Sequence, residues 1–183
     1  MRQGILSDLL AVPSTSINAD DLAREIAGGG QPTPEQSLRA AQLCDDRLDE
    51  AIAARRSVMV ETVLSSDKLK RRVEVARTSD FEIALVYVTL RDGRLNVARV
   101  AQRNAQGGHD VPPDRVLGRR SRSHAQFEWF ARRADIVLVF DNTAIPTYAA
   151  GCVGGAWDLA NVDLLPDELA TTIRTLHAED RPH

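Results

Sequence analysis

Short apolar runs alternate with longer segments of helical spacing along this chain of 183 residues. The strongest run is residues 82–90, EIALVYVTL, and a second apolar run covers residues 135–140. Residues 58–60 form a shorter run, and residues 16–18 read as the tip of another strand. Strands that are separated by helices pair in parallel, and the helices cover both faces of the resulting sheet. The pattern therefore predicts an α/β fold with three layers, built on a mostly parallel sheet.

The segments between these strands begin and end at proline and glycine, as helices do. Gly28, Gly29 and Gly30 end one helix, and Pro34 begins the next. The predicted helices cover residues 2–11, 20–27, 34–55, 67–77 and 95–106, then a segment from the loop at 107–113 to about 133, and one from about 166. No linker or repeat divides them, so we expect a single domain over residues 1–183. Residues 146–183 carry no recognised motif and are expected to complete the edge of the sheet.

The composition narrows the class of protein. Hydrophobic residues make up 43% of the chain and charged residues 27%, which is typical of a globular domain with one core. Cys44 and Cys152 are the two cysteines, and their spacing fits neither a zinc site nor a disulfide framework. The chain has no basic-then-apolar leader and no run of about 20 apolar residues, the length that a membrane span requires. We therefore expect a cytoplasmic protein that binds no membrane.

A formal net charge of −3 conceals a strong segregation of charge along the chain. Residues 1–54 carry a net charge of −5 and residues 134–183 carry −6, whereas residues 99–133 carry +5. Lys68 and Lys70 are the only lysines, so every cation of this basic segment is an arginine. The planar fork of arginine matches the geometry of phosphate, so the segment indicates a phosphorylated ligand. Because aromatic residues are not interleaved with these arginines, we do not expect binding to nucleic acid.

Polar side chains follow the predicted strands, at the sheet edge where α/β proteins bind their ligands. In chain order they are Asn18 and Asp20, Glu61 and Thr62, Arg91 and Asp92, and Asp141 and Asn142. Asp20 is either the N-cap of the following helix or a carboxylate that accepts the proton of a substrate hydroxyl. Glu61 is either a solvated strand end or a carboxylate that meets a cation or ligand. The residue types alone leave both pairs of alternatives open.

Arginines recur on both sides of a glycine-containing loop. They are Arg99, Arg103, Arg115, Arg119, Arg120 and Arg122. The first two lie four residues apart on one helical face, as do the third and fourth, and the loop at residues 107–112 reads GGHDVP. Like charges at this spacing repel one another unless an anion joins them, so the pattern predicts a helical lid over about residues 99–133 that closes on phosphate. A solvated basic face is the alternative. His109 in the loop either contacts phosphate or stabilises the loop.

Together, these motifs resemble those of the zeta-toxin-type kinases. The matching segments are Asn18-Ala19-Asp20, Glu61-Thr62 with Leu64-Ser65, Arg99-Val100-Ala101-x-Arg103-x3-GGHDVP with the arginines that follow it, and Asp141-Asn142. The resemblance runs from about residue 4 to about residue 145. It implies a P-loop kinase fold and ATP with Mg²⁺ as the phosphoryl donor. In the toxin members it also implies phosphorylation of the sugar of UDP-N-acetylglucosamine, and an antitoxin-like protein as a partner.

The resemblance also implies roles for individual residues. Asp20 matches the catalytic base, and Asn18, Glu61 and Thr62 match strand ends that bind the substrate. The remaining site residues belong to the predicted lid, with Arg119 and Arg120 expected in catalysis and Arg103, His109 and Arg122 expected at the nucleotide or phosphate. No residue of this chain is expected to be the main ligand of Mg²⁺.

The chain departs from this family pattern at its start. Zeta-toxin-type kinases begin with an apolar strand and a G-x-x-x-x-G-K-[ST] loop, whose amides and lysine bind phosphates and whose hydroxyl holds Mg²⁺. The sequence contains no such loop, and neither Lys68 nor Lys70 follows one. The strand is central in such sheets, so its loss leaves unpaired edges on two neighbours. Either the natural start lies upstream, which the persistence of the site residues favours, or the protein is a degenerate relative.

The sequence thus predicts an ATP-dependent phosphotransferase that acts on a hydroxyl of a small molecule or nucleotide sugar. Without the loop, the form of 183 residues is expected to be inactive. The alternative is a non-catalytic pseudokinase or protein-binding module, whose acidic ends meet a basic partner.

Overall fold

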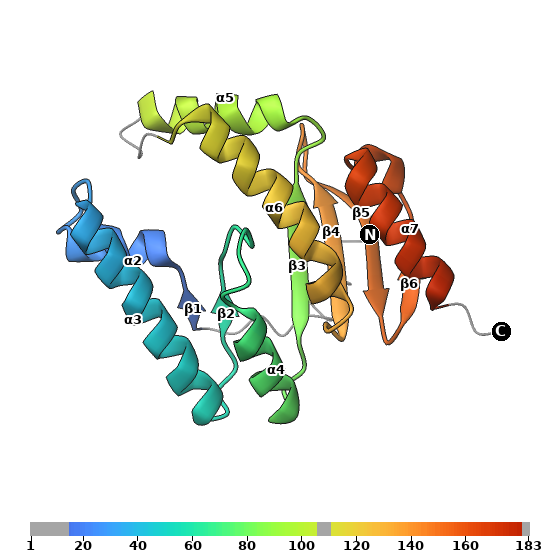
Figure 1. The fold of residues 1–183 in the computed structure, drawn as a ribbon, viewed down its shortest axis with the longest axis horizontal. Helices are drawn as coiled ribbons and strands as arrows, with labels where there is room; N and C mark the ends of the chain where they lie inside the picture. The colour runs from blue at the N-terminus through green and yellow to red at the C-terminus, as the bar shows by residue number, and fades with distance from the viewer. Residues whose placement is uncertain (1–14, 106–110, 181–183) are drawn as a thin grey trace. The chain divides into compact units, whose positions relative to one another are not determined.

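The computed structural model describes residues 15–105 and 111–180 (Figure 1). The chain forms two compact units, Met1–Thr62 and Val63–His183. The described strands form two separate sheets, with two strands in the first unit and four in the second. This differs from the one sheet expected from the sequence. The predicted helix over residues 2–11 and His109 lie outside the described residues.

The first unit joins two short parallel strands through two helices. In chain order its elements are β1 (Ser16–Ile17), α2 (Ala19–Ile26), α3 (Pro34–Ala53) and β2 (Met59–Val60). In the register of the sheet, Ser16 lies opposite Met59 and Ile17 opposite Val60. This pairing brings the residues that follow each strand, Asn18 and Glu61, to the same end of the sheet.

Local signals in the sequence explain the boundaries of these helices. The Oγ1 of Thr33 accepts a hydrogen bond from the Gln36 amide at 3.2 Å, and the Gln36 side chain accepts one from the Thr33 amide at 2.8 Å. This capping box, with Pro34 as the first helical residue, begins α3. Gly28 and Gly29 follow α2 with φ of +64° and +86°, a conformation that favours glycine and ends the helix.

The second unit alternates helices and strands before it ends in a hairpin and a last helix. Its described elements are α4 (Lys70–Thr78), β3 (Ala84–Thr89), α5 (Gly93–Ala105), α6 (Pro113–Ala131), β4 (Ile136–Asp141), β5 (Thr147–Val153), β6 (Ala156–Asp158), the 3-10 turn η1 (Val162–Leu164) and α7 (Asp167–Glu179). The strand order is β3-β4-β5-β6. β3 and β4 are parallel, whereas β5 and β6 are antiparallel to their neighbours. This sheet is therefore mixed, and not mostly parallel.

The hairpin of β5 and β6 explains this difference. Gly154 and Gly155 lie between the paired residues Val153 and Ala156, with φ of +57° and +84°. Two consecutive residues with positive φ form the tight turn that matches the twist of antiparallel strands. The Gly-Gly pair is a local signal for this hairpin, within a segment that carries no recognised motif.

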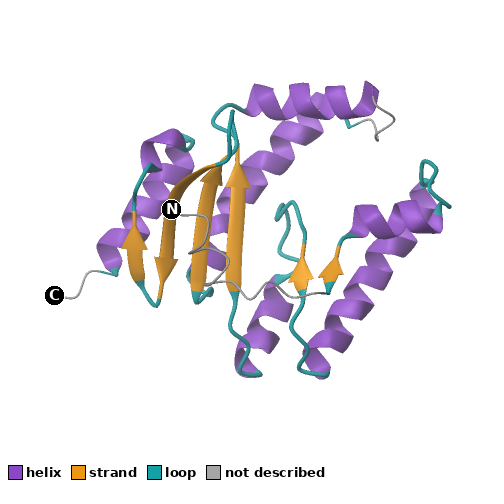
Figure 2. Ribbon diagram, turned by 180° about the vertical axis from the view of Figure 1, so that it is seen from behind, coloured by secondary structure: helices purple, strands orange, loops and turns teal. Residues whose placement is uncertain are grey.

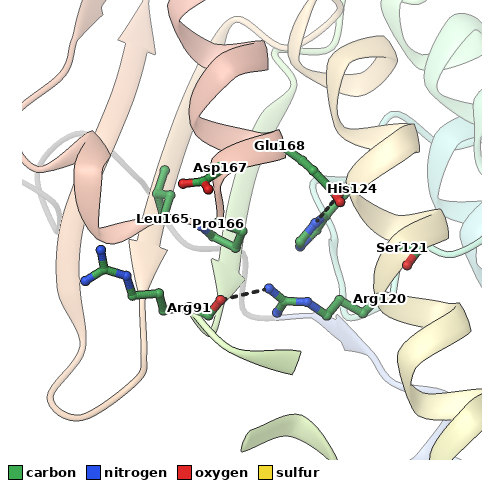
Figure 3. A pocket seen from close by; sticks show the side chains of 8 residues that line it. All are labelled: Arg91, Arg120, Ser121, His124, Leu165, Pro166, Asp167 and Glu168. Atoms are coloured by element: carbon green, nitrogen blue, oxygen red, sulfur yellow. Dashed lines mark hydrogen bonds and ion pairs between the residues drawn. The ribbon is translucent and has the colours of Figure 1, made fainter. Parts of the chain in front are cut away.

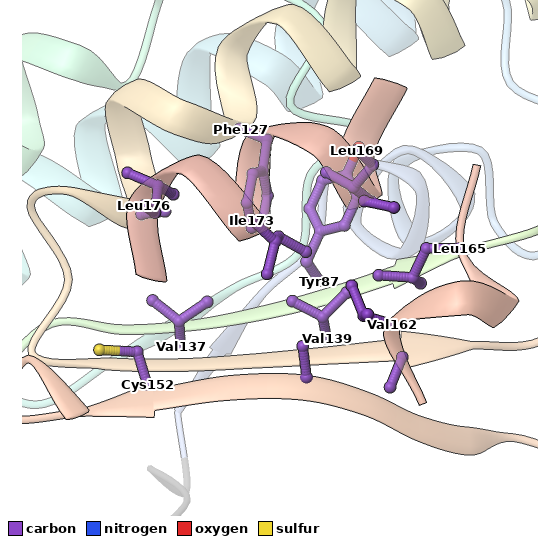
Figure 4. Close-up of a cluster of buried hydrophobic side chains, with 14 of the residues drawn as sticks. Tyr87, Phe127, Val137, Val139, Cys152, Val162, Leu165, Leu169, Ile173 and Leu176 are labelled. Carbon is purple, nitrogen blue, oxygen red and sulfur yellow. The ribbon is translucent and has the colours of Figure 1, made fainter. Parts of the chain in front are cut away.

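The hydrophobic core of the second unit lies between its sheet and helices α6 and α7 (Figure 4). Phe127 from α6 and Ile173 from α7 are fully buried against Val137 and Val139 of β4. Tyr87 of β3 packs edge-on against Phe127, with ring centroids 5.0 Å apart. Burial of these large side chains is the main source of stability in this unit.

Helices α6 and α7 cover one face of the sheet of the second unit (Figure 2). On the other face, Val86 and Val88 of β3 are 50% and 57% exposed. Among the described residues β3 pairs with β4 alone, and β2 pairs with β1 alone. The additional central strand that the family resemblance implies stays a prediction. Of the helices that the structure describes, none combines the length and apolarity needed to span a membrane.

Candidate functional site

The structure brings together two predicted substrate-binding residues in the first unit, Asn18 and Glu61. The Asn18 side chain donates a hydrogen bond from Nδ2 to Glu61 Oε2 at 2.6 Å. Its Oδ1 accepts from the backbone amide of Asp20 at 2.8 Å and more weakly from that of Asp21 at 3.3 Å. Asn18 is therefore the N-cap of α2 and also holds the carboxylate at the end of β2.

The same contacts exclude one of the two alternatives for Asp20, whereas its catalytic role stays a prediction. The cap of α2 is Asn18, so the carboxylate of Asp20 does not serve as the N-cap. Asp20 lies in the first helical turn, is exposed, and has no side-chain partner among the described residues. The neighbouring Asp21, in contrast, forms an ion pair with Arg24 at 2.7 Å. Thr62 is exposed and follows Glu61 at the end of the first unit.

The arginines of α5 and α6 lie in the second unit, and several of them bind the protein's own backbone. Arg99 donates to the carbonyl oxygens of Asn142 and Thr143 at 2.8 and 3.2 Å. Arg122 donates from Nε to the carbonyl of Ser65 at 3.2 Å. These bonds attach α5 to the segment after β4 and α6 to the segment before α4. Neither the predicted closure on phosphate nor a merely solvated basic face accounts for them.

Arg120 is the most constrained of these residues. Its Nη1 donates to the Leu90 carbonyl at 2.7 Å and to Asn96 Oδ1 at 3.2 Å, and its Nη2 donates to the Arg91 carbonyl at 3.2 Å. Burial lowers the pKa of this guanidinium from its ordinary value, although an arginine stays charged at any physiological pH. Arg120 thus fixes the residues after β3 and their contact with α5, while its Nε–H and one Nη2 hydrogen remain unused by these bonds.

Arg119, next to Arg120, differs from it completely. It is exposed and has no partner among the described residues. Arg115 is exposed one turn earlier in α6, also without a described partner. Arg103 falls in the last turn of α5, and its side chain lies outside the described part of the structure. The predicted lid arginines therefore divide into anchored residues and exposed residues.

The ends of β3 and β4 are joined by a network around Asp141. Its Oδ1 accepts from the Thr143 hydroxyl at 2.5 Å and from the Thr143 amide at 3.2 Å. The Thr143 Oγ1 in turn accepts from the Arg91 amide at 2.9 Å. Asp92 caps α5, because its Oδ1 accepts from the Arg94 amide at 2.8 Å. Both acidic residues thus have structural roles at their strand ends.

A cavity of about 430 Å³ opens beside this network, at the carboxyl end of β3 (Figure 3). Its lining comes from the second residue after β3, from α6, and from the first turn of α7 with the two residues before it: Arg91, Arg120, Ser121, His124, Leu165, Pro166, Asp167 and Glu168. The sequence predicts polar groups at the carboxyl end of a strand. Of the residues that line the pocket, it indicates only Arg91, as a strand-end residue, and Arg120, as a lid arginine. The pocket is the candidate binding site of the second unit.

His124 is a buried polar residue in the wall of this pocket, 8% exposed. Its Nδ1 lies 3.5 Å from Glu168 Oε2, and its Nε2 lies 3.4 Å from Thr89 Oγ1. Burial, followed by the charge of Arg120, lowers the pKa of His124 below its ordinary value, against the opposing influence of Glu168. Burial and the charge of Arg120 therefore favour the uncharged imidazole. A polar residue on the buried face of α6, one turn after Arg120, was the signal in the sequence.

The described residues do not form a site that would hold Mg²⁺. In the described ranges, no three side chains of His, Cys, Asp or Glu converge in a way that would hold a metal ion. The sequence also lacks the G-x-x-x-x-G-K-[ST] loop, whose hydroxyl would be the expected ligand. No step of the chemistry is therefore assigned to a metal held by this chain.

The α/β fold is consistent with a P-loop NTPase-like domain of the kinase type, and the family comparison supports this class. In a comparison with protein families, residues 7–139 match the AAA domain family. Because the match covers well over half of the chain, the protein belongs to this family. The matched range spans both units, from before β1 to within β4. Comparisons with curated proteins and with solved structures found no match.

Proposed function

We propose that this protein is an ATP-dependent phosphotransferase of the zeta-toxin-like class, acting on a hydroxyl of a small molecule or nucleotide sugar. Family membership supports a nucleotide-binding, kinase-like domain. The observation that carries the finer proposal is the role of Asn18, which caps α2 and holds Glu61. This arrangement leaves the Asp20 carboxylate without a described partner at the strand end where an acceptor hydroxyl is expected.

In the proposed reaction, the acceptor hydroxyl oxygen attacks the γ-phosphorus of ATP. A new oxygen–phosphorus bond forms, and the bond to the leaving ADP oxygen breaks. The Asp20 carboxylate receives the hydroxyl proton, and Glu61, held by Asn18, orients the acceptor. The family resemblance assigns neutralisation of charge on the transferring phosphoryl group to the lid arginines, of which Arg119 is exposed. Arg120 acts as a positioning residue, since its bonds to the residues after β3 hold α6 in place.

The missing phosphate loop leads to the first experimental expectation. The chain of 183 residues is expected not to bind ATP measurably, because backbone amides and a lysine of such a loop supply most phosphate contacts in P-loop proteins. Isothermal titration calorimetry of this chain with ATP and Mg²⁺ tests it. Micromolar affinity would refute the expectation and would show that other residues replace the loop.

A second experiment tests the chemistry itself. The chain is extended before Met1 with an apolar strand and a G-x-x-x-x-G-K-[ST] loop, and ATP-dependent phosphorylation of UDP-sugars and simple sugars is followed by ³¹P NMR. Asp20→Ala is expected to abolish turnover in this extended protein and to leave ATP binding intact. Asp21→Ala is the matched control, since Asp21 is engaged by Arg24 one turn along the helix. Equal turnover of the two variants would remove Asp20 from the mechanism.

A non-catalytic binding module is the second candidate function. The observation that favours it is the use of Arg99, Arg120 and Arg122 as internal anchors, which takes cations away from phosphate. This candidate predicts an extended protein without kinase activity that co-purifies with the product of a neighbouring gene, such as an antitoxin-like protein. Phosphoryl transfer by the extended protein would exclude it.

A further inference from the structure

The pocket at the carboxyl end of β3 has walls of opposite charge. Arg91 and Arg120 contribute two guanidinium groups, and Asp167 and Glu168 contribute two carboxylates. With an uncharged His124, the lining has no net charge. A simple anion meets the carboxylates, and a simple cation meets the guanidinium groups, so neither complements the whole pocket.

Among the described residues, the opposite charges of this pocket form no direct ion pair with one another, although the charge of Glu168 opposes the lowering of the Arg120 pKa. Among the described residues, the ion pairs within 4.0 Å that involve these four side chains include only the contact of Glu168 with His124. Arg120 donates to carbonyl and amide oxygens instead. The side chains of Arg91 and Asp167 are exposed and have no described partner. Opposite charges that line one cavity without pairing are available to a ligand that carries both signs.

Hydrogen bonds within the protein also order the Arg120 side chain before any ligand binds. Three oxygen atoms fix the plane of its guanidinium, while two of its hydrogens stay free. A side chain that is already ordered loses less conformational entropy when a ligand binds. Leu165 and Pro166 add an apolar surface to the same cavity, suited to the hydrocarbon part of a small molecule.

We propose that this pocket binds a small zwitterion, with its anionic group against Arg91 and Arg120 and its ammonium group against Asp167 and Glu168. Phosphate or carboxylate is the anionic group that guanidinium recognises. The proposal does not depend on phosphoryl transfer, because it concerns binding to the second unit in the absence of ATP. Its failure would leave the proposed reaction at Asp20 untouched.

Calorimetric titration of the chain of 183 residues with three matched compounds tests the proposal. Phosphoethanolamine carries both charges, ethyl phosphate lacks the ammonium group, and ethanolamine lacks the phosphate. Phosphoethanolamine is expected to bind at least about tenfold more tightly than either of the others, since a charge-assisted hydrogen bond contributes roughly this factor. Absence of binding, or equal affinity for phosphoethanolamine and ethyl phosphate, would overturn the proposal.

Two substitutions test which side chains bind the anionic group and which bind the ammonium group. Arg91→Ala is expected to weaken binding of phosphoethanolamine and of ethyl phosphate alike, by about tenfold. Asp167→Asn is expected to weaken phosphoethanolamine by a similar factor and not to weaken ethyl phosphate. Arg94→Ala is the control, because Arg94 lies outside the pocket with its side chain 92% exposed. Circular dichroism melts verify that each variant is folded. If Asp167→Asn leaves the affinity for phosphoethanolamine unchanged, the zwitterion proposal is wrong.

Discussion

Arginine has two different uses in α6, and they are adjacent in the sequence. Arg120 donates three hydrogen bonds to oxygen atoms around the end of β3, whereas Arg119 is exposed without a described partner. The difference follows from helical geometry, because consecutive residues project about 100° apart and only one of them faces the sheet. Composition and spacing alone do not distinguish an arginine that anchors a backbone from one that is available to phosphate.

Arg120→Ala is expected to reduce the free energy of unfolding by about 2–3 kcal/mol, because it removes charge-assisted bonds and leaves partly buried oxygens unpaired. Arg119→Ala, the matched control, is expected to change it by less than about 0.5 kcal/mol. Urea denaturation followed by fluorescence measures both. Similar losses for the two variants would contradict the assigned roles.

Protonation of a single residue, His124, makes the free energy of unfolding depend on pH. Its pKa is lowered by burial and by Arg120, so the unfolded chain binds a proton at a higher pH than the folded one. The contribution of His124 to the free energy of unfolding is therefore fully present above the ordinary pKa of histidine, about 6.5. It is lost as the pH drops below this value towards the folded-state pKa. Tyr87, Thr89 and Glu168 surround the ring and do not reverse this direction.

The His124→Gln variant is expected to lose this part of the pH dependence. Urea midpoints of the natural chain and the variant are compared at several values between pH 8 and pH 5. The difference in unfolding free energy between the two should shrink or change sign in favour of the variant as the solution becomes acidic. A constant difference over this range would show that His124 is not the titrating group.

At the scale of elements, the close approach of β4 and β5 explains why position 151 is a glycine, which the sequence alone does not explain. A Cβ on Gly151 would lie 2.7 Å from the Val137 carbonyl oxygen and 2.7 Å from the Tyr148 hydroxyl. The backbone cannot yield as a flexible side chain can. Gly118 in α6 differs, because a Cβ there would meet only the end of the Arg122 side chain, at 3.3 Å.

The same substitution at these two glycines is therefore expected to have opposite effects. Gly151→Ala should destabilise the second unit by about 1–3 kcal/mol, through overpacking between two strands. Gly118→Ala should stabilise it by about 0.5 kcal/mol, because alanine restricts the unfolded chain and favours the helix. Thermal unfolding measures both, and a stable Gly151→Ala variant would show that β5 shifts to accept a side chain.

At the scale of the whole molecule, the two units differ in how much structure supports them. In the first unit each described strand has two residues, and α2 packs on α3 through Leu22, Ala23 and Ala40. The second unit has six-residue pairing between β3 and β4 and a core that includes Phe127 and Ile173. A two-stranded sheet of this length contributes little by itself, so most stability belongs to the second unit.

We expect the units to open at different free energies. In hydrogen exchange measured by mass spectrometry, amides of α2 and α3 should exchange faster than those of β4 and α7. Trp129 and Trp157 both lie in the second unit, so fluorescence unfolding should follow the slower-exchanging part. Uniform protection across Thr62 would show instead that the two units open as one.

The sequence by itself determined most described elements, because proline, glycine and capping residues act within one or two turns of the chain. Motifs around Asp20, Glu61 and the arginines indicated a P-loop kinase-type family, which the family comparison supports, whereas the zeta-toxin resemblance stays a prediction. The sequence did not predict the hairpin after β4, because β5 and β6 lack a strong alternation of apolar and polar residues. Only the tertiary structure decided that Asn18 binds Glu61, that Arg120 anchors a strand end, and that His124 contacts Glu168. Those contacts join residues that the folded backbone brings together across helices and strands, and local preferences carry no information about such distances.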